Sequence, residues 1–170
     1  MNNGYTHRFG KNTGGIKQIL LTPADNIASA TVDPKTGHYR SLTLREPAKL
    51  AEYSFAEGAA QYREETGVRN GIPSVVHTLE FHTDRIDRES DSLLRYLNHA
   101  SYTGLAAVVT TNNHTRLVVG YSEEHRAERP LRLFNVAAAS GKAHTDAGHE
   151  AISLTCRDTA KARILDGNID

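Results

Sequence analysis

The sequence predicts a single mostly-β domain, built as a β-sandwich or a barrel-like pair of packed sheets, with one α-helix against it. About eight segments show the alternating or β-rich pattern of strands. One segment, residues 87–102, repeats its apolar residues at helical spacing. The 170 residues fit one domain, without an internal repeat or low-complexity tract. We expect a flexible arm over 1–15, a β-rich domain over 16–157 and a polar tail over 158–170.

The first strands are predicted in the N-terminal quarter of the chain. Ile16 begins a short apolar strand that Pro23 interrupts, and residues 30–32 look like a second strand segment. Residues 33–37, of sequence Asp-Pro-Lys-Thr-Gly, predict a turn because proline presets φ and glycine tolerates positive φ. Strand character then resumes over 39–44.

The segment 50–66 fits either a helix or strands. Its apolar residues include a set at helical spacing, whereas Tyr53 and Phe55 alternate with polar residues as in a strand. We favour two strand arms that meet at a bulge or bend near Gly58. A turn follows over 67–71, where an Asn-Gly pair is typical of hairpins.

The clearest strand and the clearest helix follow one another. Residues 73–83 form a strand whose two faces are Val75, His77, Leu79 and Phe81, and Val76, Thr78, Glu80 and His82. The helix over 87–102 has acidic residues near its start, where they suit the helix dipole. Gly104 provides its C-terminal stop.

The C-terminal half is predicted to be mostly strands. A hairpin joins 105–111 to 115–121 through an Asn-Asn-His turn, since asparagine tolerates left-handed φ. A charged loop over 122–129 precedes a strand over 130–139, and a polar loop over 140–148 follows it. Alternation then predicts a last strand, which contains Ile152, Leu154 and Cys156.

Composition excludes several classes of function. The 20 basic residues balance the 20 acidic ones, which argues against a chain-wide electrostatic hold on nucleic acid or on an anionic membrane. Cys156 is the only cysteine, so no internal disulfide forms and a reducing compartment is expected. The N-terminus lacks the apolar core of a signal peptide, and no apolar run approaches the ~20 residues of a membrane span.

No residue pattern indicates catalysis or a cofactor. Among nine histidines, His144 and His149 lie in a glycine-containing loop whose spacing matches no zinc motif, while His77 and His82 fall on opposite strand faces. Cys156 sits on a predicted core face, where it behaves as a small hydrophobe. Nucleophile and phosphate-loop motifs are absent. We therefore predict no catalytic, cofactor-binding or metal-binding residues, and a protein that is not an enzyme.

The remaining signal lies in the strands between residues 50 and 80, which are long, two-sided and only modestly hydrophobic. Exposed strand edges are an aggregation hazard for a monomer. They become useful when identical subunits pair edge to edge and close into a ring. An ordinary amphipathic sheet covered by its own loops explains the same residues equally well.

The order of elements resembles that of tailed-bacteriophage tail tube proteins and of related tube proteins in contractile injection systems. The resemblance is one of pattern over roughly residues 16–157. It rests on the segments Ala51-Glu52-Tyr53-Ser54-Phe55-Ala56-Glu57 through Tyr62, Val75-Val76-His77-Thr78-Leu79-Glu80-Phe81, Ser92-Leu93-Leu94-Arg95-Tyr96-Leu97, Leu105-Ala106-Ala107-Val108-Val109, Asn112-Asn113 and Leu117-Val118-Val119-Gly120-Tyr121.

The resemblance implies a virion protein of the tail, assembled in the host bacterial cytoplasm. Its subunits would form hexameric rings that stack around a channel through which DNA passes without specific binding. Its partners would be copies of itself and other tail proteins. The family's channel is typically acidic, and the candidate channel-lining residues are Glu52, Glu57, Glu64 and Glu65. Arg63 and Arg69 oppose that charge; the N-terminal arm and the loops 122–129 and 140–149 would be inter-ring contacts.

Two other functions compete with a tail tube. One is a different ring at the head–tail junction, such as a tail terminator or connector, which would not stack into long tubes. The other is a small metal-dependent enzyme or ligand-binding β-domain that uses the histidines. Stoichiometric zinc, lost on His144→Ala or His149→Ala, would favour this last function.

Overall fold

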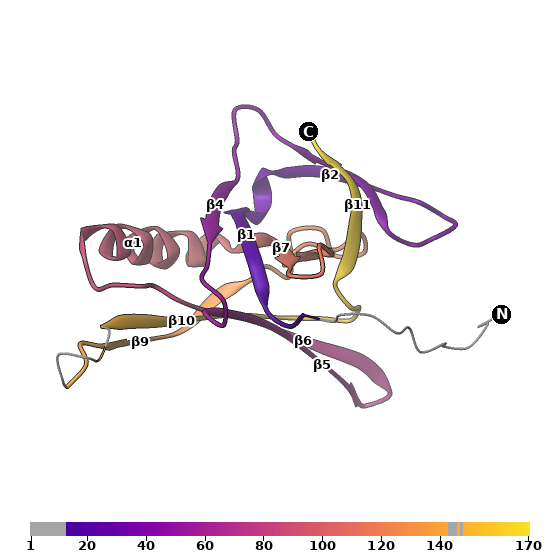
Figure 1. Cartoon of the computed structure of the whole chain (residues 1–170). Coiled ribbons are helices and arrows are strands. Elements are labelled where there is room, and N and C mark those ends of the chain that lie inside the picture. The colour runs from indigo at the N-terminus through magenta and orange to yellow at the C-terminus, as the bar shows by residue number, and fades with distance from the viewer. Residues whose placement is uncertain (1–12, 143–145, 147) are drawn as a thin grey trace.

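The computed structural model describes residues 13–142, 146 and 148–170, and it confirms the predicted fold class. A four-stranded sheet forms one layer, and a seven-stranded sheet and a single helix lie on one side of it (Figure 1). The arm predicted over 1–15 falls almost wholly outside the described residues. Part of the loop predicted over 140–148 also lies outside them.

The described residues form eleven strands and one α-helix. In chain order these are β1 (Ile16–Pro23), β2 (Ile27–Val32), β3 (Tyr39–Leu44), β4 (Ala51–Ser54), β5 (Ala60–Arg69), β6 (Ile72–His82), α1 (Arg88–Thr103), β7 (Leu105–Thr111), β8 (Arg116–Val119), β9 (Arg132–Ala139), β10 (His149–Asp158) and β11 (Arg163–Ile169), with a 3-10 turn at Ala24–Asn26.

The seven-stranded sheet, of order β2-β3-β11-β8-β7-β1-β4, is apolar on both faces near its centre. Within β7, Ala107 and Val109 belong to one buried cluster, while Ala106 and Val108 belong to another on the opposite face. Strands that are buried on both faces need continuous apolar runs rather than alternation. The Leu-Ala-Ala-Val-Val sequence that begins β7 has that character.

The four-stranded sheet, of order β5-β6-β10-β9, is apolar on one face only. The predicted alternation along β6 is confirmed, because Leu79 and Phe81 are fully buried while His82 is exposed. Along β10 the same alternation buries Ile152, Leu154 and Cys156. Burial of these side chains against β1, β7 and α1 holds the two layers together.

The helix is fixed at both ends by its own sequence. The Asp87 carboxylate accepts hydrogen bonds from the backbone N–H groups of Glu89 and Ser90, and Ser90 Oγ accepts one from the Asp87 N–H. This capping box satisfies donors that the first turn leaves free. Gly104 ends the helix at a φ of 91°, where a Cβ would collide with Pro130. Leu97 and Ala100 face the core, which confirms the helix predicted over 87–102.

The segment 50–66 forms strands, as predicted, but the two arms belong to different sheets. β4 pairs with β1 and β5 pairs with β6, and the chain turns between them at Gly58, with a φ of 80°. The turn predicted over 67–71 is shorter than expected. Only Asn70 and Gly71, both with positive φ, separate β5 from β6, as in a two-residue hairpin.

The predicted polar tail over 158–170 is wrong, because residues 163–169 form β11 inside the seven-stranded sheet. β11 lies between β3 and β8 and runs parallel to β3. Its sequence, Arg-Ile-Leu-Asp-Gly-Asn-Ile, has too many polar residues to predict a strand. Pairing on both sides and full burial of Leu165 override that local preference.

Candidate functional site

The four-stranded sheet has two open edges. β5, of ten residues, pairs only with β6, and β9, of eight residues, pairs only with β10. The edges of the seven-stranded sheet are shorter, since β2 has six residues and β4 has four. Long unpaired edges present rows of free N–H and C=O groups that can pair with another chain. The two open edges are therefore the candidate functional site.

The register of the β5–β6 hairpin shows which groups of β5 are free. The His82 N–H donates to the Ala59 carbonyl at 2.8 Å. In an antiparallel ladder, residues that bond to the partner alternate with residues that face away. The groups that face the open edge are therefore those of Tyr62, Glu64, Thr66 and Val68. Across the part of the chain that the structure describes, none of these four forms a backbone hydrogen bond with another segment.

The open groups of β9 follow from the same alternation carried across β10. The Thr83 N–H donates to the Glu150 carbonyl at 2.9 Å, which places the even-numbered residues of β10 against β6 and the odd-numbered ones against β9. This leaves the backbone of Val136 and Ala138 facing outward. Phe134 occupies a bulge in β9, and 75% of its surface is exposed.

The C-terminal end of α1 covers only the beginning of β9. The Arg132 guanidinium donates to the carbonyls of Ser101 and Tyr102 at 2.6 and 2.9 Å, and the Leu133 N–H donates to Ser101 Oγ at 2.8 Å. Beyond Leu133 no described residue shields the edge of β9 by a backbone hydrogen bond. The open part of this edge is thus residues 134–139.

The face of the four-stranded sheet that points away from the core is polar, and by register its charged residues are Glu65 and Glu80 with Arg63, Arg69, Arg132 and Arg157. Arg63 lies within 3.5 Å of the Glu65 carboxylate and 3.9 Å of the Glu80 carboxylate, so its charge is shared between them. Most other side chains there are small or uncharged. By register this face includes Gln61, Val76, Thr78, Ser153, Thr155, Asn135, Ala137 and Ala151, with Arg132 and Arg157 toward one end.

The four glutamates predicted to line a channel do not share one surface. Glu65 alone has its side chain on the exposed face of the four-stranded sheet, with 71% of that side chain accessible. Glu52 lies on β4, where its carboxylate accepts a hydrogen bond from Gln18, and Glu57 lies in the turn before β5. Glu64 is turned inward, with 17% of its side chain accessible. Adjacent strand residues point to opposite faces, which separates Glu64 from Glu65.

Glu64 belongs to a buried polar network that sequence analysis missed. The Tyr62 hydroxyl lies 3.0 Å from Glu64 Oε2 and 2.7 Å from His77 Nδ1. Its single proton is therefore shared between these two acceptors. His77 Nε2 donates to the Ala160 carbonyl at 3.2 Å, and the Ala162 N–H donates to Glu64 Oε2 at 2.9 Å. These bonds fasten the connection between β10 and β11 to the β5–β6 hairpin.

Burial sets the protonation of this network. The pKa of His77 is lowered because desolvation penalises the charged ring, although the nearby Glu64 carboxylate opposes the shift. The pKa of Tyr62 is raised by desolvation and by Glu64, which keeps the phenol protonated. Tyr62 and Glu64 lie two residues apart on one strand face. That spacing, with His77 on the facing strand, was the only signal in the sequence.

The other residues weighed for chemistry are dispersed. His82 stacks on His149 with ring centroids 5.3 Å apart, and His144 lies outside the described residues. Within residues 13–142, 146 and 148–170, no three potential metal ligands come together. Cys156 is buried, as predicted, and burial raises the pKa of its thiol to about 12. None of the helices in that part of the chain is long and apolar enough to cross a membrane.

Comparison with protein-family models, curated proteins and solved structures gave no significant match. The function is therefore inferred from the geometry of the two open edges, the polar face between them and the resemblance in element order.

Proposed function

We propose that this chain is a tail tube subunit of a tailed bacteriophage or a related injection machine. Copies of the chain form hexameric rings, and the rings stack around a channel that conducts DNA. The observation that carries the proposal is the pair of long open edges, β5 and β9, on opposite sides of one four-stranded sheet. Each edge presents free N–H and C=O groups that can pair with those of the other.

Strand direction makes the two edges compatible. Neighbouring strands of the four-stranded sheet are all antiparallel, so β5 and β9 run in opposite senses. In a ring, rotation about the axis preserves the sense of each strand. β9 of one copy therefore meets β5 of the next as an antiparallel neighbour, and the joined sheets close into a barrel without a free edge.

Exposed aromatic side chains at the beginning of β9 support a contact there. Tyr102 is 80% exposed at the end of α1, and Phe134 is 75% exposed in the β9 bulge. Both lie at the open edge, beside the Arg132 bonds that join α1 to β9. Burying aromatic side chains in a contact is favourable, and aromatic residues are enriched in interfaces.

The polar face of the four-stranded sheet would line the channel. Its small polar residues leave room, and Arg63 is neutralised by Glu65 and Glu80. The exposed Arg69 and Arg157 lie toward one end of this face, so the rest of the wall offers DNA phosphates few of the lysine and arginine contacts that dominate DNA affinity. DNA can then pass along the channel without specific binding because few cations attract its phosphates, even where the wall is not strongly acidic.

Negative-stain electron microscopy of the concentrated full chain tests the proposal, with Thr66→Pro as the breaking variant. The Thr66 N–H faces the open edge, so proline there leaves the β5–β6 ladder intact while removing a donor from the subunit contact. We expect rings and tubes with a central hole from the wild type, and folded monomers from Thr66→Pro. The matched variant Thr66→Ala keeps the N–H and should assemble like the wild type.

Tubes from Thr66→Pro would overturn the role of the β5 edge. A strictly monomeric wild type, at concentrations where the chain stays folded, would overturn the proposal as a whole. Closed rings that never stack would point instead to a single ring at the head–tail junction. Circular dichroism and thermal melting of each variant confirm that the monomer is folded.

A further inference from the structure

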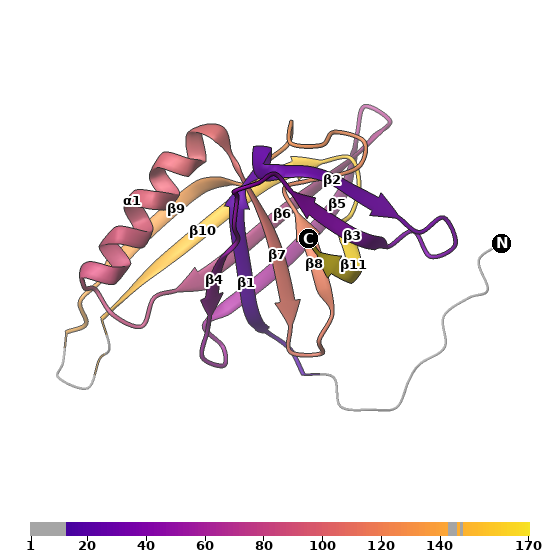
Figure 2. The ribbon, with the colours of Figure 1, turned by 90° about the horizontal axis from the view of Figure 1, so that it is seen from above.

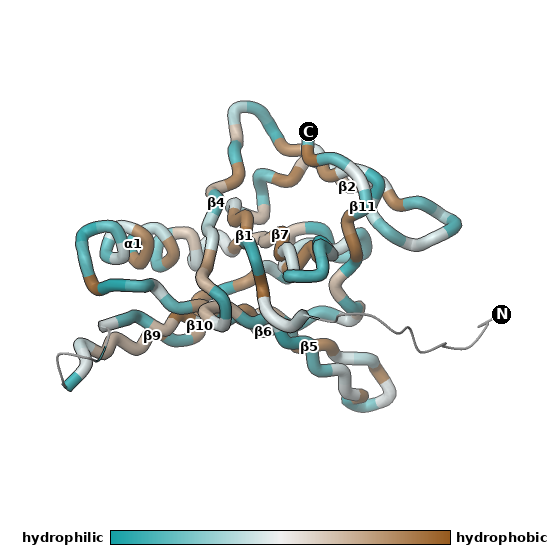
Figure 3. The backbone as a smooth tube through the Cα atoms, viewed as in Figure 1, coloured by the Kyte–Doolittle hydropathy of each residue, from teal (hydrophilic) through white to brown (hydrophobic). Residues whose placement is uncertain are grey.

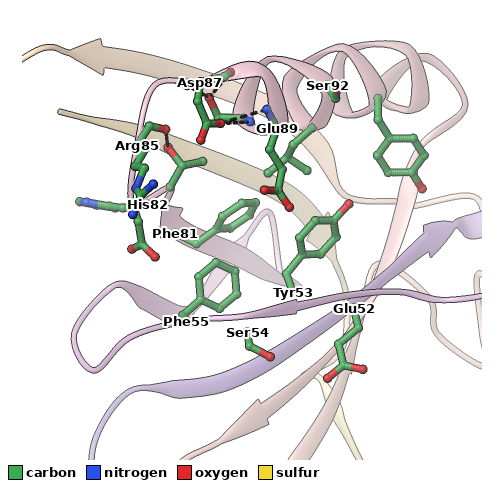
Figure 4. Close-up of a pocket in the computed structure, with 15 residues that line it drawn as sticks. Glu52, Tyr53, Ser54, Phe55, Phe81, His82, Arg85, Asp87, Glu89 and Ser92 are labelled. Atoms are coloured by element: carbon green, nitrogen blue, oxygen red, sulfur yellow. Dashed lines mark hydrogen bonds between the residues drawn. The ribbon is translucent and has the colours of Figure 1, made fainter.

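An open groove lies at one end of the four-stranded sheet, between β4, the end of β6 and the first half of α1 (Figure 4). Its volume is about 690 Å³. Its floor is aromatic: Tyr53 and Phe55 reach it from β4 and the turn after it, and Phe81 from β6, with Phe55 and Phe81 rings 5.3 Å apart. Leu93 and Tyr96 of α1 complete the apolar lining.

The lining of this groove carries an excess of carboxylates. Glu52, Asp84, Asp87 and Glu89 all contribute to it, against the single guanidinium of Arg85. The Asp87 carboxylate caps α1, whereas the Glu89 side chain extends from the helix toward the aromatic floor (Figure 4). An apolar floor with an acidic lining suits an occupant that has apolar side chains and a positive charge.

The tip of the β5–β6 hairpin has that chemistry. Val68 is 74% exposed and Ile72 is 61% exposed, which makes them two of the most exposed large apolar residues in the described part of the chain. Arg69 lies between them in sequence and is also exposed. The tip projects beyond the rest of the fold (Figures 1 and 2), and its apolar residues appear in brown in Figure 3.

The groove and the hairpin tip lie at opposite ends of the same strand. β6 begins beside the tip at Ile72 and ends beside the groove at Phe81 and His82. Figure 2 shows the β5–β6 hairpin tip and the elements that line the groove, β4 and the beginning of α1, at opposite corners of the four-stranded sheet. A surface and its complement at opposite ends of one molecule cannot meet within it, and a head-to-tail contact between copies is the arrangement that would bring them together.

We propose that the hairpin tip of one copy docks in the aromatic groove of another copy, and that this contact joins successive rings. This inference rests on the ring proposed above. Edge pairing of β5 with β9 extends the sheet sideways, so the strand ends point out of the plane of the ring. In the contact, Val68 and Ile72 cover the aromatic floor while Arg69 faces the carboxylates of the groove.

The test compares the assembly of tip variants with that of the wild type, by negative-stain microscopy and sedimentation velocity. Val68→Ser/Ile72→Ser should give single closed rings of wild-type diameter and few or no tubes, because serine keeps the backbone N–H and C=O groups through which the β5 edge pairs. Gly67→Ala is the matched control, since a Cβ at this hairpin position meets nothing within 4 Å. It should form tubes like the wild type.

Charge reversal adds a readout that a loss of folding cannot imitate. Arg69→Glu should shorten tubes at least several-fold at low salt, because it places a carboxylate against the acidic lining. Asp84→Lys reverses one groove charge ahead of the helical cap of α1. Combining it with Arg69→Glu should restore tube length toward that of the wild type.

Two results would overturn this contact. Tubes of normal length from Val68→Ser/Ile72→Ser would show that the tip does not join rings, while leaving the ring itself intact. Folded monomers from the same variant would show that the tip acts in ring closure instead. A wild type that forms no rings would contradict the edge pairing of β5 with β9. The proposal of ring formation and the proposal of ring stacking are therefore contradicted by different results.

Discussion

The two sheets of this protein differ in the length of their unpaired edge strands and in the polarity of their faces. The seven-stranded sheet is built from both halves of the chain, is apolar on both faces at its centre and ends in short strands, β2 and β4. The four-stranded sheet has one apolar face, one polar face and long open strands at both sides. One sheet ends in short edge strands, and the other leaves two long edges on which a further strand can pair.

Under the proposed assembly, this difference predicts that folding and ring formation depend on separate residues. Substitutions that alter the seven-stranded sheet should change the stability of the monomer. Substitutions at the open edges or on the projecting hairpin should change assembly and leave the monomer folded. The expected effects below run from the largest to the smallest.

The largest contrast is expected between two strand glycines, one in each sheet. A Cβ on Gly167, in β11, would collide with the backbone of Arg40 on β3, whereas a Cβ on Gly67, in β5, meets nothing within 4 Å. We expect Gly167→Val to destabilise the monomer by about 4 kcal/mol or more, because backbone must move. Gly67→Val should change stability by less than about 1 kcal/mol. Urea unfolding measures both.

Equal losses from the two glycine substitutions would contradict the comparison. The Thr66→Pro background keeps the protein monomeric in these measurements, so that assembly does not contribute to the unfolding free energy.

The stability contributed by the buried network of Tyr62, Glu64 and His77 should depend on pH. The folded-state pKa of His77 lies below its usual value of 6.5 because burial disfavours the charged ring. As pH falls through about 6.5, the unfolded chain binds this proton first. Stability that is fully present above that pH is therefore lost below it, by at most about 1.4 kcal/mol per pH unit. Urea unfolding between about pH 5 and about pH 8 measures the loss.

His77→Gln provides the control for this pH dependence, because glutamine keeps a polar side chain and does not titrate. The difference in unfolding free energy between wild type and variant should shrink as the pH falls. Parallel curves for the two proteins would show that His77 does not titrate on unfolding.

Local patterns in the sequence predicted most of the fold. Three patterns that depend only on residues near one another in sequence were confirmed: the alternation along β6 and β10, the helical spacing around Leu97 and the helix stop at Gly104. β11 was missed because its environment is not local. Its residues are polar, and its strand conformation comes from pairing with β3 and β8, which are distant in sequence.

The sequence raised the possibility of exposed strand edges, but it did not show which strands form both of them. The modest hydrophobicity of the strands in residues 50–80 indicated exposed edges, and β5 is such an edge. The second edge, β9, was not identified, because strand order within a sheet depends on the chain path rather than on composition. Of the four glutamates proposed for a channel, Glu64 is held inward by Tyr62 and the Ala162 N–H, contacts that no spacing rule reveals.

Hydrogen–deuterium exchange of the assembled wild type and of the Thr66→Pro monomer tests most directly whether copies of the chain complete the four-stranded sheet. The amides that face the open edges and are present in both samples, those of Tyr62, Glu64, Val68, Val136 and Ala138, should exchange at least about tenfold more slowly in the assembly, since each new hydrogen bond must open before its amide exchanges. Amides of β2, at the border of the other sheet away from the aromatic groove, should exchange at the same rate in both samples. Unchanged exchange along β5 and β9, or new protection confined to β2, would contradict the account.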